Sequence, residues 1–272
     1  MEGVGATATM TAAARARETE RTDHLFDDPW AAALAGEDGF AFLNAQDAAS
    51  GLVEPNPAFV VRHRFFDDFV WERAVTGIHQ VVLVAAGLDT RAYRLPWPGG
   101  VTLFEIDQPS VLTYKRAVLE QADASPKCVL RSVAVDLRDD WTPQLLREGY
   151  DPQQPSMWIA EGLLYYLPAQ AVHGLLESAA TLACPGSVLG TDTMSATFLS
   201  DPSREAWLKF YEEAGAALTF GVNDPARLLE EHGWEPMLHG YPEIARALGR
   251  RWPSPPEQGA VNAVITGLRP TS

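Results

Sequence analysis

Six short segments rich in apolar and β-branched residues recur through the chain from residue 80 onward, and this pattern constrains the fold more than any other feature. They cover residues 80–86, 101–107, 128–136, 156–161, 187–193 and 260–269. The first, QVVLVAA, is continuously apolar, as expected of a strand buried on both faces of a sheet. Helical patterns such as QPSVLTYKRAVLEQA lie between them. Strands that alternate with helices predict an α/β fold with a mostly parallel sheet and helices on both faces.

The region before the first predicted strand has helical patterns only. Residues 1 to about 10 are small and unpatterned, and we expect them to be loose. One helix is predicted from Thr11, which suits a cap, and a second from Asp28 to Gly36. A longer amphipathic helix is predicted over residues 55–77.

The chain therefore divides into an N-terminal helical region, residues 1–78, and an α/β core, residues 79–272. Within the core, residues 194–220 read as an extra helical insertion before a helix at 224–232, and the Pro-rich residues 252–259 read as a loop. Neither the N-terminal region nor the insertion is needed to complete the sheet. Because insertions carry specificity on such folds, we expect both to form a lid over the binding site.

Charge and composition exclude several classes of function. The formal net charge is −15 and the sequence holds no run of Lys or Arg, so nucleic acid is not expected as a partner. No apolar run approaches the ~18 residues of a membrane span, and no secretion signal opens the sequence, so we expect a cytoplasmic protein without a membrane partner. The two cysteines form no CxxC and the six histidines have no metal-ligand spacing, so no metal is expected.

The end of the first predicted strand, AAGLDTR, is the candidate cofactor site. Gly87 allows close approach of a ligand to the backbone, and Asp89 and Thr90 suit a helix cap or cofactor support. Glu105 and Asp107 end the next strand about 20 residues on, where a carboxylate accepts from ribose hydroxyls. The turn lacks the G-x-G-x-x-G of dinucleotide binding, and Asp89 would repel a pyrophosphate. These features favour a cofactor without phosphate but with cationic groups, namely S-adenosyl-L-methionine.

Four ordered pieces of the chain resemble the leucine carboxyl methyltransferase family, in particular its bacterial O-methyltransferase branch. They are VVLVAAGLDTRAYRL, TLFEIDQPSVLTYKR, VAVDLRDDW and IAEGLLYYL, and the segments TAAARARE…HLFDDPWA and VRHRFFDDF resemble that branch as well. The likeness runs from about residue 11 to 267. It implies a Rossmann-like class I methyltransferase with a seven-stranded sheet. One departure is Ala85, where the family usually has glycine.

The resemblance also implies roles for particular residues. It assigns Arg62 to the cofactor carboxylate, as a bidentate charge-assisted pair, and Gly87 with Ala85 to the turn near the methionyl part. It assigns Asp107 to the ribose, with Glu105 as the local competitor, Asp136 and Leu137 to the adenine, and Glu161 to the methionyl amine. A second basic residue at the carboxylate is either Arg15 or Arg17. Arg91 is predicted to form a structural ion pair rather than to take part in catalysis.

The implied activity is methyl transfer to an oxygen of a small-molecule acceptor, which is an in-line displacement that needs alignment and exclusion of water. A carboxylate acceptor needs no general base, whereas a phenol benefits from one. The insertion and the Tyr165–Tyr166 pair are predicted to line the pocket of a bulky, polyketide-like metabolite of secondary metabolism, with Phe198, Trp207 and Tyr211 as its candidate residues. Two alternatives stay open: methylation of a protein C-terminal carboxylate, and a Rossmann-like NAD-binding protein.

Overall fold

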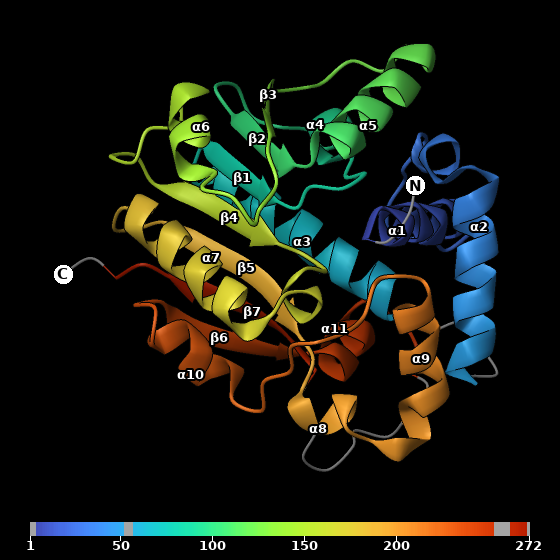
Figure 1. Cartoon of the computed structure of the whole chain (residues 1–272). Coiled ribbons are helices and arrows are strands. Elements are labelled where there is room, and N and C mark those ends of the chain that lie inside the picture. The colour runs from blue at the N-terminus through green and yellow to red at the C-terminus, as the bar shows by residue number, and fades with distance from the viewer. Residues whose placement is uncertain (1–3, 52–56, 253–261, 271–272) are drawn as a thin grey trace.

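A computed structural model describes residues 4–51, 57–252 and 262–270. Its centre is a seven-stranded sheet in the order β3-β2-β1-β4-β5-β7-β6 (Figure 1). The strands are β1 (Gln80–Val84), β2 (Thr102–Asp107), β3 (Val129–Ala134), β4 (Ser156–Ala160), β5 (Val188–Thr193), β6 (Glu235–Gly240) and β7 (Ala263–Leu268). Neighbouring strands among β1 to β5 pair in parallel, and β7 is antiparallel to both β5 and β6. The predicted α/β fold with a mostly parallel sheet is confirmed.

Helices cover both faces of the sheet, and the alternation of side chains along each strand builds two cores. On β1, Val81 and Leu83 join the core beneath α3 (Ala58–Val75), α5 (Pro109–Gln121) and α11 (Tyr241–Ala247). Val82 and Val84 join the core beneath α6 (Thr142–Arg147), α7 (Ala169–Leu182) and α10 (Pro225–Glu230). A strand with apolar side chains on both faces needs this double cover, which explains its continuously apolar sequence.

The first helix, α1 (Val4–Thr19), begins earlier than predicted. Residues 4–10 are helical rather than loose, and Thr11 lies inside the helix, where its Oγ1 donates to the carbonyl of Ala8 at 2.9 Å instead of capping. The small residues pack closely against α2 (Ala31–Ser50): a Cβ at Gly39 of α2 would lie 2.6 Å from the carbonyl oxygen of Thr9. This packing orders the N-terminal turns, and local pattern alone does not reveal it.

The predicted end of the second helix at Gly36 is confirmed as a break in helical backbone: one helical segment ends there and a second continues to Ser50, so that α2 consists of two segments joined at a kink. Gly36 takes φ 58° and ψ −177° and makes a kink that only glycine adopts readily. The Asp28 carboxylate lies at the start of the helix, where its Oδ1 accepts from the amide of Trp30 at 3.4 Å, and its Oδ2 accepts from Arg15 and Thr90. The third helix is present as α3, and residues 55–56 of its predicted range lie outside the described residues.

Two elements near the C-terminus were not predicted, the edge strand β6 and helix α11. The segment EPMLHG contains a proline, and Met237 is 63% exposed, so it lacks the apolar pattern of a buried strand. Residues 194–220 contain helices as expected, α8 (Ala196–Leu199), a short 3-10 turn and α9 (Glu205–Glu213), and residues 214–220 are irregular. Two further short elements are α4 (Arg91–Arg94) and a 3-10 turn at Leu164–Tyr166. Residues 253–259 of the expected Pro-rich loop lie outside the described residues.

Candidate functional site

A cavity of about 230 Å³ lies at the carboxyl ends of β1, β2 and β4. Helix α1 contributes Thr7, Ala8, Thr11 and Arg15 to its wall, so the N-terminal region directly covers the end of the sheet (Figure 1). Three guanidinium groups and three carboxylates line it: Arg15, Arg62, Arg91, Asp89, Asp107 and Glu161. The positive and negative charges of the lining are therefore balanced, and apolar residues such as Val84 and Ile159 lie among them.

The turn after β1 is shaped by two residues with left-handed backbone conformations, Ala85 at φ 54° and Gly87 at φ 51°. The amide of Gly87 donates to Asp107 Oδ2 at 2.6 Å, and the amide of Gln108 donates to Asp107 Oδ1 at 2.7 Å. A Cβ on Gly87 would lie 3.5 Å from the Cβ of Ala8, so α1 packs directly over this turn. Burial raises the pKa of the Asp107 carboxyl. Asp107 thus joins the ends of β1 and β2 at the cavity wall.

Glu105, the alternative to Asp107, is engaged elsewhere. It is 2% exposed and its Oε1 lies 2.5 Å from Nζ of Lys115 on α5. It does not belong to the cavity lining. Both side chains leave the same face of β2, but Glu105 lies one pleat deeper and under α5, whereas Asp107 ends the strand.

Arg62 and Glu161 meet at the cavity, although 99 residues separate them. Arg62 Nε donates to Glu161 Oε1 at 3.1 Å, and its Nη1 donates to the hydroxyl of Tyr165 at 2.8 Å and to Asp192 Oδ2 at 2.9 Å. Among the described residues, Arg62 Nη2 has no hydrogen-bond partner. Despite burial, the arginines beside Glu161 hold its pKa well below the usual range, so the carboxyl is ionised.

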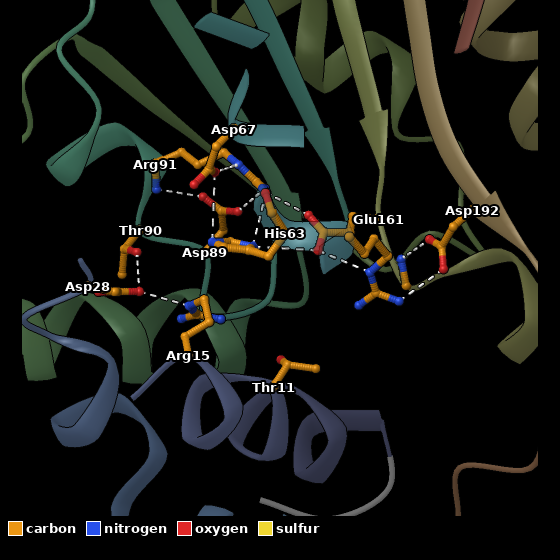
Figure 2. Close-up of polar contacts among 12 residues, drawn as sticks. Thr11, Arg15, Asp28, His63, Asp67, Asp89, Thr90, Arg91, Glu161 and Asp192 are labelled. Carbon is orange, nitrogen blue, oxygen red and sulfur yellow. Dashed lines mark hydrogen bonds and ion pairs between the residues drawn. The ribbon is translucent and has the colours of Figure 1, made fainter. Parts of the chain in front are cut away.

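Arg91 is almost fully buried and lies at the centre of a polar cluster (Figure 2). It donates to Asp67 Oδ1 and Glu161 Oε2, both at 2.8 Å, and also contacts Asp89. His63, Asp89 and Glu161 present atoms close enough together to hold a cation. The guanidinium of Arg91 contacts all three residues and supplies the positive charge there itself. The expected structural ion pair of Arg91 is confirmed, and it is buried.

His63 and Asp67 were not singled out from the sequence, yet they belong to this cluster. His63 Nδ1 lies 3.0 Å from Arg91 Nη2, and Nε2 lies 2.6 Å from Nη2 of Arg94. Burial and the charge of Arg91 lower the pKa of His63, so the ring is neutral at pH 7. The available signals were the i, i+4 spacing of His63 and Asp67 and the i, i+3 spacing of Arg91 and Arg94.

Arg15 lies at the cavity, and Arg17 does not line it. Arg15 Nε donates to Asp28 Oδ2 at 2.8 Å and Nη2 donates to the carbonyl of Leu88 at 2.7 Å, while Nη1 has no hydrogen-bond partner in the described part of the chain (Figure 2). Arg17 pairs with Asp47 of α2 at 2.6 Å. Thr90 donates to Asp28 and makes no side-chain cap. At the start of α4 it is Asp89 whose carboxylate accepts from a backbone amide, that of Arg91.

The remaining predicted residues divide into two groups. Tyr165 and Tyr166 line the cavity, with ring centroids 4.8 Å apart. Asp136 and Leu137 lie beyond the end of β3 and are not part of the cavity lining; Asp136 pairs with the exposed Arg138.

The aromatic residues of the insertion also lie outside the lining. Trp207 contacts Phe198 and Tyr211 edge to face, and Tyr211 packs near Phe42 of α2. The hydroxyl of Tyr211 donates to Sδ of Met10 on α1 at 3.8 Å. The insertion therefore supports the helices that cover the cavity, because its buried face is used for packing.

The sequence was compared with protein families and with known proteins. The profile of the leucine carboxyl methyltransferase family matches residues 8–180. A protein of Mycolicibacterium paratuberculosis named "Putative S-adenosyl-L-methionine-dependent methyltransferase" is 41% identical, over 90% of this chain and 88% of its own. A Mycolicibacterium smegmatis protein with a corresponding name is 41% identical over 96% of this chain and 92% of its own.

Solved structures share the fold at low sequence identity. A "putative methyltransferase" from Thermobifida fusca superposes with a TM-score of 0.62 at 17% identity, covering 87% of this chain and 90% of its own. A DUF574 family protein from Streptomyces avermitilis gives a TM-score of 0.60 at 16% identity, covering 86% and 91%. At such identities the likeness concerns the fold alone.

Proposed function

Because this chain belongs to the leucine carboxyl methyltransferase family and is an S-adenosyl-L-methionine-dependent methyltransferase, we propose that it methylates an oxygen of a small-molecule acceptor. The observation that carries the proposal is the small cavity at the strand ends, where α1 forms one side opposite the charged wall. A cavity of about 230 Å³ favours a small acceptor over a protein chain terminus, which an extended groove would suit better.

The residues at the cavity fit the charged groups of the cofactor. Arg15 Nη1 and Arg62 Nη2 have no hydrogen-bond partner among the described residues, and a carboxylate would accept from both. Asp107 would accept from the ribose hydroxyls, and Glu161 would pair with the methionyl amine, since ionised carboxylates keep further lone pairs. When bound, the cofactor supplies a methyl group that its sulfonium makes electrophilic.

An NAD-binding role fits this turn poorly. In a dinucleotide fold, amides of the first βα turn are offered to the pyrophosphate. Here the Gly87 amide donates to the carboxylate of Asp107, and Asp89 adds a second carboxylate to the lining. The turn therefore offers carboxylate oxygens, rather than a free Gly87 amide, where a pyrophosphate would have to bind.

The proton acceptors of the cavity favour a carboxylate as the acceptor group over a phenol. Within the described lining, His63 faces arginine donors at both ring nitrogens, and Glu161 accepts from two arginines. Burial raises the pKa of Tyr165 and keeps its hydroxyl protonated. A carboxylate arrives ionised at neutral pH and needs none of these groups as a base.

The lid proposal can be refined with the same contacts. Helix α1 contributes directly to the lining of the cavity, and α9 of the insertion packs against α2 outside it. Arg15 joins α1 to the carbonyl of Leu88 in the turn after β1. We therefore propose that α1 excludes water from the transferred methyl group, while the insertion buttresses it.

The test is incubation with isotopically labelled S-adenosyl-L-methionine and pooled metabolite extracts, in parallel with a pool of peptides and proteins. We expect label in small molecules only. Treating the products with mild alkali separates the acceptor groups, because methyl esters release methanol and aryl ethers do not. Label confined to the protein pool would contradict the small-molecule proposal, and alkali-stable label would contradict the carboxylate preference.

A further inference from the structure

Asp192, at the carboxyl end of β5, is a buried carboxylate that does not belong to the cavity lining and connects three other parts of the fold. It is 2% exposed. Its Oδ1 accepts from the amide of Gly162 at 2.6 Å, and its Oδ2 accepts from Arg62 Nη1 at 2.9 Å and from the hydroxyl of Tyr241 at 3.2 Å. One side chain thus holds α3, the turn after β4 and the start of α11. Figure 2 shows Asp192 on the opposite side of Glu161 from the Arg91 cluster.

The guanidinium of Arg62 lies against bare backbone at Gly162. A Cβ at this position would lie 3.0 Å from Arg62 Nη2, and Gly162 has φ 69°, so both space and conformation call for glycine. Asp192 holds the amide of the same Gly162. Its two oxygens therefore fix the guanidinium and the surface beneath it at the same time.

Three nitrogens of the Arg62 guanidinium can donate hydrogen bonds, and contacts within the protein use two of them. Nε is engaged by Glu161 and Nη1 by Tyr165 and Asp192. Nη2 is the nitrogen without a hydrogen-bond partner among the described residues, and Arg62 lines the cavity. Arginine has a rigid planar fork, so fixing two of its nitrogens also fixes the direction of the third.

We infer that Asp192 is a positioning residue, which acts through Arg62 and Gly162 to direct Arg62 Nη2 toward the carboxylate of the bound cofactor. The inference rests on the proposed cofactor site. Tyr241 contributes by donating to Asp192, and burial beside Asp192 raises the pKa of Tyr241 and keeps its hydroxyl protonated. Asp192 does not line the cavity and acts through Arg62, so its effect should be confined to the end of the cofactor that carries the carboxylate.

The experiment compares two ligands by calorimetry, S-adenosylhomocysteine and 5′-methylthioadenosine, of which the second lacks the amino-acid end. Asp192→Asn is expected to weaken the binding of S-adenosylhomocysteine about tenfold, as for the loss of one charge-assisted hydrogen bond. It is expected to leave the binding of 5′-methylthioadenosine unchanged. A purely structural role would weaken both ligands alike, and that result would overturn the inference.

Two further variants complete the test. Tyr241→Phe removes the hydroxyl that donates to Asp192. It is expected to weaken the binding of S-adenosylhomocysteine, by less than Asp192→Asn does, and to leave the binding of 5′-methylthioadenosine unchanged. This variant keeps the inference testable if Asp192→Asn does not fold. Asp68→Asn is the matched control, because Asp68 pairs with Arg64 on the exposed side of α3 and neither residue lines the cavity. Absence of S-adenosylhomocysteine binding by the unaltered protein would overturn the proposed function and this inference with it. Binding that Asp192→Asn leaves unchanged or tightens would overturn the inference alone.

Discussion

Arg91 Nη2 donates to Glu161 Oε2 at 2.8 Å and so ties the turn after β1 to the turn after β4. The Arg91 side chain is 1% exposed and that of Glu161 is 13% exposed. Arg91 also bonds Asp67 and Asp89, which makes it the shared cation of three carboxylates. The cavity wall is therefore built on a buried ion network whose members come from α3, α4 and two strand ends.

Replacing Arg91 by lysine should destabilise the protein by about 2–4 kcal/mol, because a single ammonium cannot reproduce the contacts that the guanidinium makes with Asp67, Asp89 and Glu161. Urea denaturation measures this change in the free energy of unfolding. Arg227→Lys is the control: Arg227 pairs with Glu231 on an exposed helix surface, and its replacement should stay within about 0.5 kcal/mol. Equal effects of the two substitutions would mean that the network contributes no more than a surface pair.

Arg62→Lys should weaken the binding of S-adenosylhomocysteine, since an ammonium cannot reproduce the fork that engages Glu161, Asp192 and Tyr165. The expected loss is roughly tenfold or more. Arg64→Lys should bind normally, because Arg64 pairs with Asp68 and lies outside the lining. Titration calorimetry gives both affinities, with a melting curve of each free variant to verify folding. Comparable losses at both positions would remove the case for Arg62.

Asp107→Ala and Glu105→Gln should have different consequences. Asp107→Ala should weaken the binding of S-adenosylhomocysteine by roughly 1–3 kcal/mol, because the ribose hydroxyls lose their acceptor at the cavity wall. Glu105→Gln should mainly lower stability, since it leaves the buried ammonium of Lys115 without its carboxylate. Affinity and unfolding free energy, measured on both variants, separate the two roles. If Glu105→Gln weakened binding more than Asp107→Ala, the assignment of the ribose partner would be reversed.

Stability should fall as the pH is lowered from 7.5 to 5.5. Burial and Arg91 lower the pKa of His63 below its ordinary 6.5, so below that value the unfolded chain takes up a proton that the folded protein does not. One such group contributes at most about 1.4 kcal/mol per pH unit. Urea midpoints across this range should show a shallower slope for His63→Asn, whereas the exposed His24→Asn should follow the unaltered protein. An unchanged slope in His63→Asn would contradict the buried neutral imidazole.

Ala85→Gly should stabilise the fold by up to about 1 kcal/mol, because Ala85 occupies a left-handed conformation that costs an L-residue about that much. Ala86→Gly is the neighbouring control. Ala86 has no positive φ, so glycine there should destabilise through added freedom of the unfolded chain. Thermal melting of both variants is sufficient, and destabilisation by Ala85→Gly would show that the methyl group of Ala85 contributes packing that outweighs the strain.

Local patterns were sufficient for the main architecture and for part of the site. The apolar runs before Gly87, Asp107 and Glu161 predicted parallel strands, and parallel strands bring their carboxyl ends to one edge. The three residues do line one cavity. The edge strand β6 was not predicted, because an exposed edge strand needs no continuous apolar sequence and tolerates proline.

Choices between neighbouring residues were decided only by the tertiary structure. Arg15 and Arg17 lie on different faces of one helix, and the placement of α1 on the turn after β1 selects Arg15 for the cavity. Glu105 and Asp107 share one face of β2. Lys115 of α5 forms an ion pair with Glu105, the deeper of the two, and Asp107 is left at the cavity.

The sequence by itself determined where strands end and which types of side chain stand there, because periodicity and turn residues are local properties. It did not determine that Arg91 is buried, that Asp192 reaches Arg62, or that Tyr211 of the insertion packs near Phe42 of α2. These facts depend on which distant segments meet. Whether burying a charge or an aromatic ring is favourable depends on the partners it contacts, and these lie tens of residues away in the chain.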